Sequence, residues 1–154
     1  MKKLAIVGYG KMGRMIEQLA SEYGFDVVAK IDQNDPIDAA KAADAAIEFS
    51  TPDAAPANLL MLASLQVPTV CGTTAWLAKL PEIEAAVAKH DATLVYSPNF
   101  SIGVNIFLRA VAETSRLMAN HAEYGAWAWE IHHDAKKDAP SGTLIKLVDE
   151  MKAA

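Results

Sequence analysis

Short apolar runs that alternate with longer alanine-rich segments are the feature that most constrains how this chain can fold. The apolar runs cover residues 4–7, 27–31, 45–49, 68–71 and 93–96. The segments between them, at residues 12–23, after Pro36, at 52–65 and at 75–89, have the apolar spacing of helices. Strands that alternate with helices in this way are typical of a buried parallel sheet. Because crossovers between parallel strands are right-handed, we expect helices on both faces of the sheet.

The pattern changes near residue 100. A long helix is predicted at 104–120, a tryptophan-rich strand at 124–131, a polar loop at 132–141 and a last helix from Gly142. We therefore expect one domain over residues 1–100 and a second unit over residues 101–154. A single strand cannot make a sheet, so we expect the second unit to be only part of an α+β domain.

Composition and charge exclude several classes of protein. Hydrophobic residues make up 52% of the 154 residues, which is enough for a buried core. The net charge is -5 and no basic run occurs, which argues against nucleic acid or an anionic membrane as a partner. No apolar run reaches the ~20 residues of a membrane span, and the run before Gly8 is shorter than the ~7–15 residues of an export signal. The lone Cys71 excludes an intrachain disulfide, fits a reducing cytoplasm and is expected in the core.

A glycine-rich turn follows the first predicted strand. Residues 8–13 read G-Y-G-K-M-G, the spacing G-x-G-x-x-G, and they open the first predicted helix. In this motif the first glycine permits a tight turn and the second allows a pyrophosphate to approach the backbone. The third lets helix and strand pack closely, while the helix N-terminus attracts negative charge. The context favours a dinucleotide site of the Rossmann type, and the alternative is a glycine-rich turn in another α/β domain.

An acid follows the second predicted strand. Asp32 lies where a carboxylate would bind the ribose 2′-hydroxyl of a dinucleotide, and the alternative is an aspartate that only stabilises a turn. An arginine beside it would indicate room for a 2′-phosphate, but the next residue is Gln33. Lys11 and Lys30 could still bind a phosphate. The sequence thus favours NADH and leaves NADPH open.

Polar residues follow the next three predicted strands, at residues 49–52, 72–74 and 97–100. In open α/β sheets, ligands bind beyond the carboxyl ends of the strands. Gly72 allows close approach of a ligand to the backbone, and the hydroxyls of Thr73 and Thr74 suit a nicotinamide ribose or carboxamide. Each segment taken alone is also typical of a helix cap or turn.

Residues 130–143 form the segment that is richest in reactive side chains. Adjacent histidines on an extended strand point to opposite faces, so His132 and His133 are not expected to bind one metal ion together. Histidine and lysine side chains can transfer protons near neutral pH. The Pro140-Ser141-Gly142-Thr143 segment precedes a helix, and its N–H groups and hydroxyls would suit an anion. The segment predicts acid–base chemistry on a carboxylate-bearing substrate, with a solvated charged loop as the alternative.

Taken together, these motifs resemble the dihydrodipicolinate reductase family through nearly the whole chain. The resemblance rests on residues 7–13, 49–52, 72–74 and 98–105, and on the more specific segments Glu130-Ile131-His132-His133 and Asp138-Ala139-Pro140-Ser141-Gly142-Thr143 with Lys136. It implies an NAD(P)H-dependent reduction that yields tetrahydrodipicolinate, on the diaminopimelate route to lysine. It also implies a cytoplasmic enzyme that forms a homo-oligomer in its full-length form.

The resemblance also implies roles for individual residues. His132 would donate or accept a proton and Lys136 would donate one, while His133, Ser141, Gly142 and Thr143 would bind the cyclic dicarboxylate substrate. Residues that would bind the cofactor are Gly8, Tyr9, Gly10, Lys11, Met12, Asp32, Gly72, Thr73, Thr74, Ser97, Pro98, Asn99 and Phe100.

Two other functions remain open. Family members continue beyond the position that corresponds to Ala154, so this chain could be a fragment that binds NAD(H) without turnover. Another Rossmann dehydrogenase is the second alternative, and the segment at 132–143 argues against it.

Overall fold

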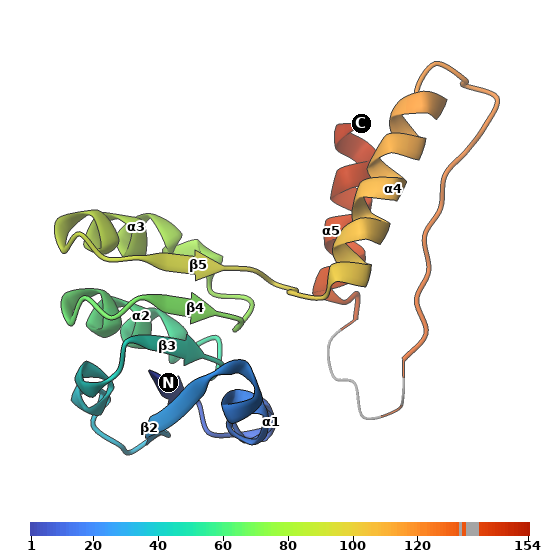
Figure 1. The fold of residues 1–154 in the computed structure, drawn as a ribbon. Coiled ribbons are helices and arrows are strands. Elements are labelled where there is room, and N and C mark those ends of the chain that lie inside the picture. Colours follow the sequence, from blue (N-terminus) through green and yellow to red (C-terminus); the bar gives the residue numbers. More distant parts are fainter. Residues whose placement is uncertain (133, 135–138) are drawn as a thin grey trace. The chain divides into compact units, whose positions relative to one another are not determined.

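The computed structural model describes residues 1–132, 134 and 139–154. The chain divides into two compact units, Met1–Ser97 and Pro98–Ala154, which are described separately (Figure 1).

The first unit contains a five-stranded parallel sheet. Its strands are β1 (Lys2–Val7), β2 (Phe25–Ile31), β3 (Ala45–Glu48), β4 (Thr69–Cys71) and β5 (Leu94–Tyr96). They lie in the order β2-β1-β3-β4-β5, and every neighbouring pair is parallel. The prediction of a Rossmann-type α/β sheet is confirmed. The order reverses between β1 and β3, the point at which ligands bind in such sheets.

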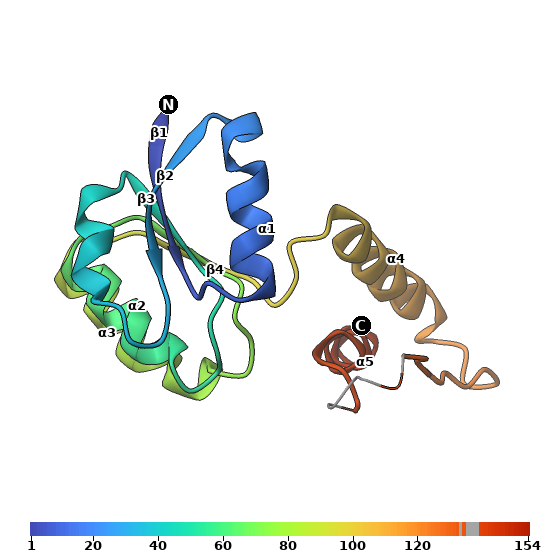
Figure 2. The same ribbon diagram turned by 90° about the horizontal axis from the view of Figure 1, so that it is seen from below.

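Helices cover both faces of this sheet. Figure 2 shows α1 (Lys11–Ala20) on one face and α2 (Ala55–Ser64) with α3 (Leu80–Lys89) on the other. Short 3₁₀ turns lie at η1 (Ser21–Tyr23), η2 (Ile37–Ala42) and η3 (Leu77–Lys79). The helix predicted from residue 52 begins at Ala55, because the preceding residues form a turn closed by hydrogen bonds from Ala54 N and Ala55 N to Thr51 O.

The core of the first unit is built on β1. Its residues Leu4 to Val7 are all buried, and successive side chains of a strand point to opposite faces of the sheet. Leu4 and Ile6 pack on the α1 side with Ala20, whereas Ala5 and Val7 pack on the other side with Leu62. A strand with both faces buried explains why this run is apolar without alternation.

The second unit contains α4 (Ile102–Met118) and α5 (Gly142–Ala153), which lie side by side in both views (Figures 1 and 2). Ser101 caps α4 by accepting a hydrogen bond from Val104 N at 3.4 Å, and Ser141 caps α5 by accepting one from Leu144 N at 3.1 Å. None of the helices in the part of the chain that the structure describes combines the length and the apolar character needed to span a bilayer.

The prediction of a strand at residues 124–131 is wrong, because this segment has no regular secondary structure. All strands among the described residues belong to the first unit. A strand is stabilised by hydrogen bonds to a neighbouring strand, and the described part of the second unit offers none. Trp127 and Trp129 are consequently 76% and 62% exposed.

The turn before η3 generates a stability prediction. Ala75 has φ +63°, a left-handed conformation that disfavours any residue with a Cβ, and it is exposed. We expect Ala75→Gly to raise the free energy of unfolding by about 0.5 kcal/mol in a denaturant titration. The same substitution at Ala57, exposed in α2, should lower it by about 1 kcal/mol. Equal destabilisation by both changes would contradict the assigned strain.

Candidate functional site

The glycine-rich turn between β1 and α1 is held against the end of β3. Gly8 has φ +91°, and a Cβ built on it would lie 2.1 Å from Phe49 O. A Cβ on Gly13 would lie 2.3 Å from Gly8 O, so close packing of α1 also requires glycine there. In contrast, no atom lies within 4 Å of a Cβ built on Gly10. Gly8 and Gly13 are therefore constrained by the protein itself, whereas Gly10 leaves space for a ligand.

A cavity of about 320 Å³ opens beside this turn. It lies at the carboxyl ends of β1, β2 and β3, entirely within the first unit. The residues that line it are Val7, Gly8, Gly10, Ile31, Asp32, Gln33, Asp35, Ile37, Phe49, Ser50, Thr51, Ala54 and Asn58. The predicted glycine turn and the predicted ribose-binding acid thus border the same cavity.

Two carboxylates border this cavity after β2. Asp35 Oδ2 accepts a hydrogen bond from Asp32 N at 2.9 Å, and Asp32 Oδ1 accepts one from Gln33 N at 3.0 Å. These bonds fix the backbone turn and hold both acids at the cavity. Two neighbouring carboxylates suit a hydroxyl donor and repel a phosphate.

A cluster is formed by Tyr9 before α1, Glu17 within α1 and Lys30 near the end of β2. Tyr9 Oη donates a hydrogen bond to the Glu17 carboxylate, and Lys30 Nζ lies 3.1 Å from Glu17 Oε1. The hydrogen bond from Tyr9 and then that from Lys30 lower the pKa of Glu17. Lys30 Nζ also lies 5.3 Å from the centroid of the Tyr9 ring. The ammonium group therefore contacts both Glu17 and Tyr9.

The ends of β3, β4 and β5 meet at one edge of the sheet. Ser50 N donates to Thr73 Oγ1 at 2.9 Å, and Ser97 N donates to Cys71 O at 3.2 Å. A Cβ on Gly72 would lie 2.0 Å from the Phe49 ring, so glycine is needed beneath that side chain. Ser50, Thr73 and Ser97 are therefore brought together, as expected for carboxyl ends of parallel strands.

Pro98, Asn99 and Phe100 belong to the second unit, where they precede α4. Asn99 Oδ1 accepts a hydrogen bond from Ser101 N at 2.8 Å, and Asn99 O accepts one from Asn105 Nδ2 at 3.0 Å. These bonds fix the entry into the helix.

A buried carboxylate beneath the cavity wall was not anticipated from the sequence. Glu48 is fully buried at the end of β3, and its Oε2 lies 3.1 Å from Cys71 Sγ. Burial, and then the hydrogen bond to Glu48, raises the pKa of the Cys71 thiol to about 12, so Cys71 is no nucleophile. A glutamate inside the apolar run at 45–49 was the signal available in the sequence, because a buried charge needs dedicated partners.

In the second unit, the carboxylate of Glu130 contacts both His132 and Ser141. Glu130 Oε1 accepts a hydrogen bond from Ser141 N at 2.7 Å, and its Oε2 lies 2.5 Å from Ser141 Oγ and 2.8 Å from His132 Nε2. The bonds from Ser141 and His132 lower the pKa of Glu130 to about 2. Glu130 thus joins His132 to the start of α5, where Gly142 and Thr143 form the first turn. His133 and Lys136 lie outside the described residues.

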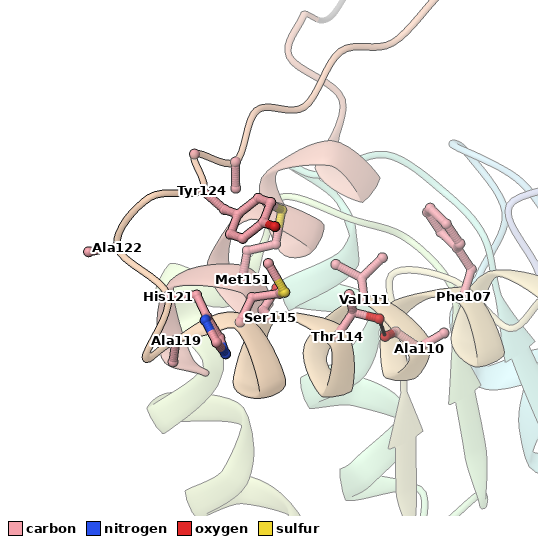
Figure 3. Close-up of a pocket in the computed structure, with 13 residues that line it drawn as sticks. Phe107, Ala110, Val111, Thr114, Ser115, Ala119, His121, Ala122, Tyr124 and Met151 are labelled. Carbon is pink, nitrogen blue, oxygen red and sulfur yellow. Dashed lines mark hydrogen bonds between the residues drawn. The ribbon is translucent and has the colours of Figure 1, made fainter.

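A larger cavity, of about 580 Å³, lies within the second unit (Figure 3). Residues of α4 line it together with Met151 of α5 and with Ala119, His121, Ala122, Tyr124, Gly125 and Ala126. Val111, Met151 and Tyr124 border it in the close-up, and the hydroxyl of Thr114 is bound to Ala110 O at 2.8 Å. None of the predicted site residues lines this cavity. Its wall is mainly apolar, with His121 and Tyr124 as the titratable residues among those that line it.

The sequence matches two models of one protein family. Residues 2–100 match the model described as dihydrodipicolinate reductase, N-terminus, and residues 103–154 match the model for the C-terminus. A 4-hydroxy-tetrahydrodipicolinate reductase from Christiangramia forsetii is 34% identical over 151 residues, which cover 96% of this chain and 63% of that protein. The enzyme of the same name from Staphylococcus haemolyticus is also 34% identical, with 97% and 64% coverage. The chain thus spans slightly less than two thirds of these relatives.

Solved structures show the same fold. A dipicolinate-bound dihydrodipicolinate reductase from Paenisporosarcina sp. matches with a TM-score of 0.73 at 21% identity, covering 99% of this chain and 66% of that one. A probable dehydrogenase from Thermotoga maritima matches with a TM-score of 0.55 at 13% identity, covering 76% of this chain and 40% of that one.

The Glu130 contacts generate a prediction of pH dependence. Because the pKa of Glu130 in the folded chain is lowered, its stabilising contribution is present above its ordinary value of 4.5 and is lost as the pH falls toward about 2. We expect the amide proton of Ser141 to titrate in NMR spectra with a midpoint near 2. In Glu130→Gln this step should disappear. A midpoint close to 4.5 in the unaltered chain would contradict the hydrogen-bonded arrangement.

Proposed function

This chain belongs to the dihydrodipicolinate reductase family, and from that premise we propose that it serves an NAD(P)H-dependent reduction that yields tetrahydrodipicolinate on the diaminopimelate route to lysine. In this proposal the first unit binds the dinucleotide, and the segment from Glu130 to Thr143 binds the substrate and transfers protons to it. The likeness to a dipicolinate-bound reductase supports a cyclic dicarboxylate as the substrate.

The cavity beside the glycine turn carries the proposal. Gly10 has open space before a helix whose first N–H groups have no side-chain cap, which suits a pyrophosphate. The remaining cofactor residues are proposed as Gly8, Tyr9, Lys11, Met12, Asp32, Gly72, Thr73, Thr74, Ser97, Pro98, Asn99 and Phe100. When bound, the reduced nicotinamide would supply the hydride.

NADH is the preferred cofactor in this proposal. Asp32 and Asp35 both border the cavity where the adenosine ribose would lie, and their carboxylates favour a 2′-hydroxyl over a 2′-phosphate. Lys30, which could have bound that phosphate, is paired with Glu17 at 3.1 Å.

His132 holds and transfers a proton in the proposed reaction, and Lys136 donates one. The Glu130 carboxylate lies 2.8 Å from His132 Nε2, so it gives the ring a fixed orientation. Ser141 in turn fixes Glu130 through its N–H and hydroxyl. Glu130 is therefore proposed as a positioning residue.

Substrate carboxylates are proposed to bind His133, Ser141, Gly142 and Thr143. The N–H groups in the first turn of a helix have no partner within the helix, so those of Gly142 and Thr143 at the start of α5 suit an anion. Because the N–H of Ser141 binds Glu130, we assign Ser141 to holding this turn as much as to binding substrate.

The decisive experiment mixes the protein with NADH and freshly generated cyclic substrate and follows the loss of reduced-cofactor absorbance. Lys136→Ala should lower turnover by about 100-fold or more, since a positioned proton donor contributes that much, while NADH affinity stays unchanged. NADH binding without oxidation above background would support the binding fragment instead. Equal losses of turnover and NADH affinity would refute the role of Lys136.

The cofactor preference has its own test. Asp32→Asn removes the negative charge beside the ribose. It should therefore weaken the binding of NADH by about tenfold and the binding of NADPH by much less. Dissociation constants for both cofactors, measured by fluorescence titration, give the comparison. If both constants rise by the same factor, the ribose contact is wrongly assigned.

A further inference from the structure

Glu48 sits at the centre of a hydrogen-bond network that joins three elements of the first unit. Its Oε1 accepts bonds from Ser50 N at 3.2 Å, from the Ser50 hydroxyl, and from Asn58 Nδ2 at 3.4 Å. Its Oε2 pairs with Cys71 Sγ in β4. The network therefore ties the loop after β3 to α2 and to β4, beneath the wall of the 320 Å³ cavity.

This network fixes which end of the Asn58 amide faces outward. The nitrogen donates to Glu48 Oε1 and to Ser50 Oγ, the latter at 3.2 Å. A carboxylate accepts hydrogen bonds, so it holds the NH₂ group toward itself and the amide carbonyl away. Rotation of the amide would place two acceptors against each other.

Asn58 belongs to the wall of the cavity, and its carbonyl oxygen is not fully buried. Among the described residues it accepts no hydrogen bond, and no fully buried side-chain oxygen or nitrogen there lacks a partner. Oδ1 is therefore accessible, and Asn58 lines the cavity. The wall thus presents an oriented acceptor to whatever occupies the space.

We propose that Asn58 Oδ1 accepts a hydrogen bond from the exocyclic amine of adenine, and that Glu48 is the positioning residue that orients it. This rests on the proposed function. Asp32 and Asn58 line the same cavity, so a base attached to a ribose at Asp32 would lie within it. An oxygen in place of the amine would face another acceptor, which disfavours hypoxanthine.

The test compares the dissociation constants of NADH and of reduced nicotinamide hypoxanthine dinucleotide, measured by calorimetry on the full chain. We expect the unaltered protein to prefer NADH by about tenfold, the cost of leaving a polar group mispaired. Asn58→Ala should reduce that preference to less than about twofold. Asn34→Ala is the matched control, because it removes an exposed amide outside the cavity and should retain the preference.

Two variants test Glu48 through the same ratio of constants. Glu48→Gln keeps an oxygen toward Ser50 and Asn58 and should retain the preference for NADH, whereas Glu48→Ala should lose it. Equal binding of the two dinucleotides by the unaltered protein, or a preference that survives in Asn58→Ala, would overturn the inference while the proposed function stands. If neither dinucleotide binds, the proposed function fails and this inference with it.

Discussion

The close approach of the Gly8 turn to the end of β3 is the contact on which the first unit depends. Phe49 N donates to Val7 O at 2.8 Å, which continues the ladder between β1 and β3 to the point where both strands end. There the backbone of Phe49 occupies the space that a side chain at residue 8 would need. A larger residue at position 8 would separate the two loops, both of which border the cavity. Phe49 then covers Gly72, so the same contact also sets the position of the loop after β4.

Much of the first unit could be predicted from the sequence because each of its strands contains a short run of apolar residues, and all five predicted runs correspond to strands of the sheet. The run in β1 is buried on both faces, whereas β2 and β5 are partly exposed. The strand predicted at residues 124–131 rested on no continuous apolar run of this kind. Its apolar residues alternate with small ones, and whether such a segment forms a strand depends on a partner elsewhere in the fold.

In the candidate site, too, some residues could be identified from the local sequence, whereas others are positioned by partners far away in the chain. The glycine turn and Asp32 have fixed spacing from the ends of neighbouring strands, so they could be identified directly. Phe49 and Asn58 owe their positions to partners in other elements, and nothing in the adjacent sequence marks those partners. Glu48 was detectable in principle, because a charged residue within a buried strand requires compensating hydrogen bonds. Its partner in β4 could not be named, since Cys71 is 23 residues away.

Glu48 and Glu130 form the same kind of hydrogen-bonded arrangement, although they belong to different units. Each accepts both the backbone N–H and the hydroxyl of one serine, Ser50 or Ser141, and each thereby fixes a loop that the proposed function requires. The serine donors to these carboxylates are neutral backbone N–H and hydroxyl groups, in contrast to the ammonium group of the exposed pair of Glu17 and Lys30, although Glu130 also contacts His132. Salt screens exposed pairs of opposite charge, whereas hydrogen bonds from neutral donors at short range are affected far less. The contacts of Ser50 and Ser141 therefore depend on direct hydrogen bonding from neutral donors, which a change in ionic strength affects little.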